Sequence, residues 1–216
     1  MKRITLLIYY LVIVSCAYFS AHGRAFKRAE NYNKYGKYEQ AVYAAVDALR
    51  LKPQYNEVEN ILDTAFPKAI KKHHHKIVRL KENQPDFYWD KIVDELRILQ
   101  DLRITIEDLN HPKTDIWLTK SNIRNYTTEI EVAKSNAAED HYKIAIQLKS
   151  KSDRESQKQA AEEFQLAQSF IGNYKDSQEL YLVCKDAGTT RIAILPFINK
   201  SGKNKYGTIG ENISNA

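Results

Sequence analysis

The sequence predicts a mainly α-helical protein, built as an irregular solenoid of helical hairpins with one β-strand near the C-terminus. Three observations support this fold class. Gly and Pro are scarce, at seven and five of 216 residues, while Leu, Ala, Lys, Glu, Gln and Ile fill long stretches. Apolar residues recur at three- and four-residue spacing along most of the chain. One continuous apolar run, residues 191–197, interrupts this pattern and indicates a buried strand.

The chain begins with the parts of a secretory signal. A positive start at Lys2 and Arg3 is followed by an apolar run over residues 4–14 and by Ser15 before Cys16. The last four residues of this segment resemble the lipobox of bacterial lipoproteins. In that family the signal is removed and the cysteine is acylated, with palmitate among the acyl groups. The resemblance implies a bacterial cell-envelope protein whose partner is membrane lipid, held through acylated Cys16 by several acyl chains.

Two other interpretations of this segment stay open. Residues 4–21 form an uncharged run close to the roughly 20 residues that a spanning helix needs, so an uncleaved anchor is one alternative. Plain secretion is the other, and all three place the body of the protein outside the cytoplasm. Ala17, rather than Asp, follows the cysteine. By resemblance to enteric lipoproteins, this favours the outer membrane, facing the periplasm or the surface.

Charge and cysteine content narrow the function classes. Removing a signal peptide at residues 1–15 takes away two positive charges and lowers the formal charge from +6 to +4. Charges of both signs are interspersed, which is typical of a solvated helical surface, so no nucleic-acid partner is expected. The second cysteine, Cys184, lies in an apolar setting. We expect a buried, unreactive thiol there and no disulfide within the chain.

Residues 16–54 are predicted to form a first hairpin of two helices. Small and aromatic residues recur at helical spacing on both sides of a break: Ala29, Tyr32, Gly36, Tyr38, Ala41, Ala48 and Pro53. The pattern resembles a tetratricopeptide repeat, which implies a protein-binding scaffold. Alanines allow close helix approach, tyrosines fill the gaps, Gly36 supplies the turn and Pro53 stops the second helix. Such a hairpin needs neighbours to bury its face.

The middle region, residues 55–136, is predicted to be helical without a clear repeat signature. A first helix over 55–81 contains Pro67, which should kink or break it near Phe66. A second helix covers 87–109, and residues 116–118 form a short apolar plug. Ser121 or Asn122 is then predicted to cap a long helix that runs to about residue 150.

Three consecutive histidines, His73, His74 and His75, raise the question of a metal site, because imidazole is a common metal ligand. Consecutive side chains on a helix point about 100° apart, so they cannot converge on one ion. We interpret the three as part of a solvated basic face, with a weak role at an anionic membrane surface as the alternative. No cofactor is expected. Neighbouring carboxylates diverge, and no phosphate loop or Ser/His/Asp signature occurs, so an enzyme is not expected.

Residues 137–187 are predicted to form a degenerate repeat hairpin and a following helix. Ala160, Phe164 and Ala167 repeat the small–large–small spacing of a second repeat helix. Gly172 is expected to cap that helix at its C-terminus.

Residues 188–216 are predicted to be a strand, a loop and the start of a helix. The strand 191–197 and residues after it resemble the opening of an α/β domain in curli secretion-channel lipoproteins, FlgO-like lipoproteins and the N-terminal domain of TolB: Asn199, Ser201, Gly202, Gly210, Glu211 and Ile213. A parallel sheet needs further strands that do not follow here. We expect an incomplete α/β domain of a longer protein, with a strand that docks on another chain as the alternative.

These features together predict a membrane-anchored envelope lipoprotein that acts as a protein–protein interaction scaffold, with an envelope protein as its partner. One alternative is an accessory component of an export or surface-assembly system, based on the resemblance over 191–213. An envelope hydrolase is the other, and no motif supports it. The sequence indicates neither an oligomeric state nor a ligand.

Overall fold

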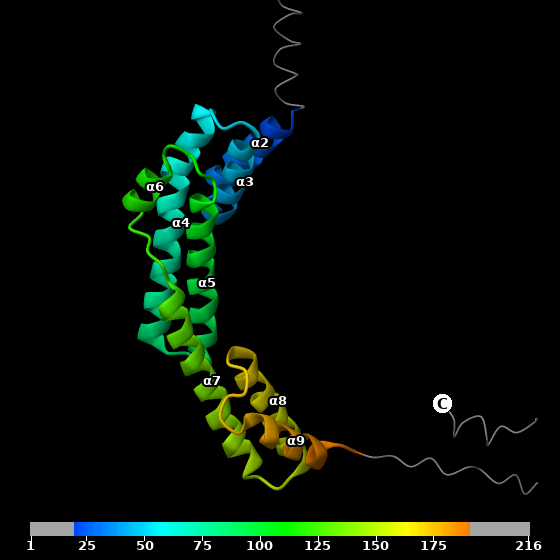
Figure 1. The fold of residues 1–216 in the computed structure, drawn as a ribbon. Helices are drawn as coiled ribbons and strands as arrows, with labels where there is room; N and C mark the ends of the chain where they lie inside the picture. The colour runs from blue at the N-terminus through cyan, green and yellow to red at the C-terminus, as the bar shows by residue number, and fades with distance from the viewer. Residues whose placement is uncertain (1–19, 191–216) are drawn as a thin grey trace, which may run out of the picture. The chain divides into compact units, whose positions relative to one another are not determined.

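The computed structural model describes residues 20–190, and every regular element within that range is a helix (Figure 1). The predicted mainly α-helical class is confirmed for this part of the chain. Cys16, the signal segment and the predicted strand 191–197 lie outside the described residues. The helices are α2 Ala21–Lys34, α3 Tyr38–Leu51, α4 Asn56–Asn83, α5 Tyr88–Glu107, α6 Thr114–Lys120, α7 Thr127–Lys149, α8 Arg154–Phe170 and α9 Ser177–Gly188.

The described residues divide into two compact units. The first unit holds residues 20–141 and 169–172, and the second holds 142–168 and 173–190. Within the first unit, helices that are adjacent in sequence pack on one another: α2 on α3, α3 on α4, and α4 on α5, with α6 against α4 and α5. Packing in sequential pairs agrees with the predicted hairpin architecture.

The first hairpin consists of α2 and α3. Ser20 begins α2, because its hydroxyl accepts a hydrogen bond from the Gly23 backbone N–H at 3.1 Å. The turn places Gly36 at φ 70°, a left-handed conformation that favours glycine. The predicted pair of helices with a turn at this glycine is therefore confirmed. Ala29, Ala41 and Ala48 are fully buried, Tyr32 and Tyr38 are half-buried, and Pro53 follows the end of α3.

Helix α4 remains one α-helix through Pro67, so of the predicted kink or break near Phe66 the break is wrong. Proline has no N–H, which leaves the Asp63 carbonyl without its helical donor. Lys120 Nζ lies 3.5 Å from that carbonyl oxygen, and Trp117 Nε1 donates to the Asp63 carboxylate at 2.8 Å. Both donors come from α6, so this short helix supplies hydrogen bonds at the point where α4 lacks one of its own.

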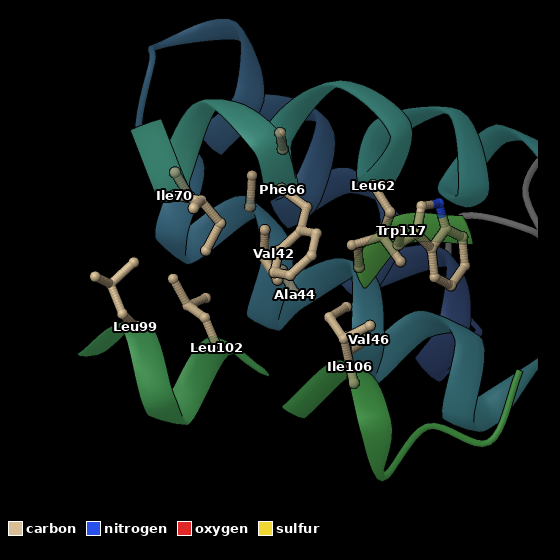
Figure 2. Packing of buried hydrophobic residues seen from close by; sticks show 14 of the residues in the cluster. Val42, Ala44, Val46, Leu62, Phe66, Ile70, Leu99, Leu102, Ile106 and Trp117 are labelled. Atoms are coloured by element: carbon tan, nitrogen blue, oxygen red, sulfur yellow. The ribbon is translucent and has the colours of Figure 1, made fainter. Parts of the chain in front are cut away.

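The core of the first unit lies where α3, α4 and α5 meet (Figure 2). Phe66 is completely buried at its centre, and Trp117 from α6 is 1% exposed. The predicted apolar plug at 116–118 is thus a helical turn whose tryptophan enters the core. Other core side chains in Figure 2 come from the three longer helices: Val42, Val46, Leu62, Ile70, Leu99, Leu102 and Ile106.

Helix α7 begins at Thr127, four or five residues later than a cap at Asn122 or Ser121 predicts. Asn122 adopts a left-handed conformation at φ 47°, and the chain stays non-helical up to Tyr126. The Tyr126 backbone N–H donates to the Gln100 side chain on α5 at 2.8 Å, and its ring is 1% exposed. The contact with α5 thus holds Tyr126 in a non-helical position, and α7 begins only after it. Its end at Lys149 agrees with the prediction.

The second unit has a small core of its own between α8, α9 and the C-terminal half of α7. Ala160, Phe164 and Ala167 are completely buried, and Tyr142 packs edge-on against Phe164. Cys184 is buried in the same core, as predicted, and burial raises the pKa of its thiol. Gly172, the expected C-terminal cap of α8, does not adopt a left-handed conformation, and the first residue after α8 with positive φ is Asn173.

Candidate functional site

A cleft follows the C-terminal half of α4. It holds about 540 Å³ and is bounded at one end by Tyr38, the first residue of α3. The other lining side chains lie at three- and four-residue spacing, which places them on one face of α4. These are Lys68, Lys71, Lys72, His75, Lys76 and Arg79.

A second recess of about 300 Å³ shares Lys76 and Arg79 with the first. It extends past the end of α4 to α5, where Lys91 and Glu95 form its wall. The rest of its lining is less charged: Leu80, Asn83 and Pro85. We call the two recesses together the α4 cleft. Their volumes lie within the range of roughly 300–1,000 Å³ typical of ligand sites.

Positive charge in the α4 cleft is only partly balanced. Lys76 pairs with Glu95 at 2.8 Å, and the Lys68 ammonium lies 5.1 Å from the centre of the Tyr38 ring. Within residues 20–190, Lys71, Lys72 and Arg79 have no carboxylate partner and are exposed. A concave surface lined by one sign of charge concentrates ions of the opposite sign. The arrangement can therefore bind an anionic group.

His73 lies beneath the cleft, between carboxylates from two other helices. Its Nδ1 is 2.5 Å from Glu95 Oε2 on α5, and its Nε2 is 3.5 Å from Glu39 Oε2 on α3. The side chain is only 2% exposed, so the prediction of a solvated face is wrong for this residue. The spacing of apolar residues along α4 explains this burial, because position 73 lies on the same buried face as Phe66, Ile70 and Ile77.

His74 makes a different contact. Its Nε2 lies 2.8 Å from the Tyr126 hydroxyl, and the ring is half-buried. Burial, with help from the Arg124 charge, lowers the pKa of His74, whereas burial raises the pKa of Tyr126. A protonated hydroxyl can thus donate to a neutral imidazole. His75 is exposed on the cleft, so the three histidines have three separate environments.

We expect the His74 contact to make stability fall in mild acid. The folded-state pKa of His74 lies below its usual 6.5, so just below pH 6.5 the unfolded chain binds more protons than the folded one. Stability is therefore lost as the pH falls from 6.5 through the folded-state pKa. Urea unfolding at neutral and mildly acidic pH measures this loss, which should be smaller in His74→Gln. Equal losses in the two proteins would contradict the assignment.

Two more histidines pack among rings. The His111 ring stacks on Trp117 at 5.0 Å, and its Nε2 lies 3.1 Å from the Pro53 carbonyl. The His141 ring stacks on Phe87 at 4.6 Å and lies 3.0 Å from an Asp90 oxygen through Nε2. Within residues 20–190, no group of three or more His, Cys, Asp or Glu side chains is placed to hold a metal ion.

The predicted site residues do not form one site. The repeat-packing residues of α2 and α3 pack in the first unit, whereas Ala160 and Phe164 of α8 pack in the core of the second unit. The lipidation residue Cys16 lies outside the described range. Reasoning from the sequence missed Tyr38 and Glu95 as parts of the cleft, since each comes from a different helix than the lysines of α4. The one available signal was the spacing of the cations on α4.

No protein-family model, curated protein or solved structure matches this chain significantly. Within residues 20–190, no helix is both long enough and apolar enough to cross a bilayer.

Proposed function

We propose that this protein is a membrane-anchored lipoprotein of the bacterial cell envelope that serves as a scaffold for a protein partner. The observation that supports the scaffold most directly is the α4 cleft, an open, cation-lined surface on packed helical hairpins. Guanidinium and phenol groups are enriched at protein interfaces, and the ammonium groups attract a partner of opposite charge. We propose no catalytic role for it.

The packing around the cleft suits a binding surface. Its walls come from α3, α4 and α5, which share one buried core centred on Phe66. The backbone of packed helices is already ordered, so partner binding costs only the freedom of the lining side chains, which favours affinity. We assign α2 and α3 to a tetratricopeptide-like hairpin, a class whose stacked helices present extended binding surfaces.

The anchor in this proposal is Cys16, five positions before the start of α2 at Ala21. Five residues of extended chain reach at most about 18 Å. Acylation of Cys16 would therefore hold the N-terminal end of α2 close to the bilayer.

Intact mass of the protein extracted from membranes tests the anchor. We expect a mass that begins at Cys16 and includes acyl chains. An unprocessed mass that retains Met1 would contradict the lipoprotein assignment. Crosslinking in the envelope, followed by purification of the full chain, tests the scaffold. We expect a covalently captured protein partner, and an empty capture would argue against this role.

A second proposal is an accessory role in an export or surface-assembly system. It rests on the resemblance of residues 191–213 to the start of an α/β domain. Further strand and helix units encoded after residue 216 in the source gene would support it. A stop codon at that point would remove its basis.

A further inference from the structure

We propose that the α4 cleft binds an extended acidic segment of the partner protein. This inference deepens the scaffold function and rests on it. Its first support is charge. Lys71, Lys72 and Arg79 lie on one exposed face without carboxylate partners in residues 20–190. Carboxylate side chains of a partner would supply the missing negative charge.

The length of the cleft suits a peptide. Lys68 and Arg79 are eleven positions apart on a continuous helix, which corresponds to about 17 Å. An extended chain covers that length with about five residues at 3.3 Å each. The two recesses follow one another and share Lys76 and Arg79, so one segment can occupy both.

The two ends of the cleft offer contacts that a peptide can use in addition to charge. Tyr38 presents an aromatic ring at one end. At the other end Leu80 and Pro85 are apolar, and the Asn83 amide can donate to or accept from a peptide backbone. Mixed apolar and hydrogen-bonding groups in a recess fit a peptide better than a plane of lipid headgroups.

Negative charge in the cleft wall is locally compensated. Glu95 is the acidic member of the lining, and both Lys76 and His73 contact its carboxylate. Its charge therefore opposes an acidic peptide less than an unpaired carboxylate would. His73 acts here as a positioning residue for Glu95, since it lies below the cleft and is not part of its lining.

Binding of a fluorescein-labelled octaglutamate peptide to the full chain, followed by fluorescence anisotropy, tests the inference. We expect saturable binding that weakens as salt is added, with no binding of the matching octaglutamine peptide. The double variant Lys71→Glu/Lys72→Glu should weaken octaglutamate binding about tenfold, because two attractions become repulsions. The single variant Arg79→Glu provides an independent check and should weaken binding about threefold.

The matched control is Lys151→Glu/Lys158→Glu, which makes the same change in net charge at exposed residues of the second unit. Its affinity for octaglutamate should stay within about twofold of the wild type. Circular dichroism confirms that each variant is folded. Equal weakening by both double variants would overturn the inference. Tighter binding of phosphatidylglycerol vesicles or of a single-stranded DNA oligonucleotide than of octaglutamate would do the same.

Partner capture distinguishes a failure of this inference from a failure of the proposed scaffold function. The envelope crosslinking is repeated with Lys71→Glu/Lys72→Glu in the full chain. Loss of the captured protein in this variant alone supports the acidic segment. Equal capture by variant and wild type overturns the acidic segment and leaves the scaffold standing. No capture by the wild type contradicts the scaffold itself.

Discussion

His73→Ala is expected to lower the free energy of unfolding by about 3 kcal/mol. The side chain is 2% exposed and contacts the carboxylates of Glu39 and Glu95. Removing a buried ring that is also a hydrogen-bond partner costs about 3–5 kcal/mol, since it leaves both a cavity and an unsatisfied polar group. We expect the lower end of this range, because Glu95 keeps Lys76 at 2.8 Å. Urea denaturation followed by circular dichroism measures the change.

His75→Ala is the matched control, two positions further along α4 on an exposed face. It should change stability by no more than about 0.5 kcal/mol. A second control, His73→Ala combined with Glu39→Gln, should recover part of the loss because it removes one of the uncompensated carboxylates. Similar stabilities of His73→Ala and His75→Ala would show that His73 is not buried between these groups.

Trp117→Ala is expected to destabilise the first unit by about 3–5 kcal/mol, the usual cost of removing a buried tryptophan. The ring is 1% exposed, stacks on His111 and donates to the Asp63 carboxylate. Its loss leaves a cavity and detaches α6 from the part of α4 that contains Pro67. The midpoint and slope of urea unfolding measure the effect.

Ile116→Ala is the control within the same short helix, since Ile116 is 57% exposed. It should change stability by about 0.5 kcal/mol or less. Trp117→Phe keeps most of the apolar ring and loses the N–H donor, so it should fall between the two. If Trp117→Ala and Ile116→Ala were equally mild, α6 would not be docked as described.

The sequence predicted the features that depend on neighbouring residues. The turn at Gly36 and the two helices around it follow from local spacing and from one left-handed glycine. The buried faces of α3 and α8 likewise follow from small residues at helical spacing. These signals lie within a few positions of one another, so no knowledge of the tertiary structure was needed.

Three of the errors have a common physical cause, since each involves a contact between residues far apart in sequence. Helix α4 continues through Pro67, where Lys120 of α6, 57 positions after Asp63, approaches the carbonyl that lacks a helical donor. The start of α7 is delayed because Tyr126 is held by Gln100 on α5. His73 is buried because its carboxylate partners come from α3 and α5. The sequence indicated the basic face of α4. That this face forms a cleft depends on side chains from α3 and α5, which the sequence did not place beside it.

The contact at Asp63 has a consequence for where substitutions in α6 take effect. The Asp63 carbonyl has no helical donor, because Pro67 lacks an N–H, and Lys120 Nζ lies 3.5 Å from its oxygen. A change at Lys120 therefore acts on the middle of α4, 57 positions earlier in the chain. Through this contact, a helix of seven residues affects one of 28.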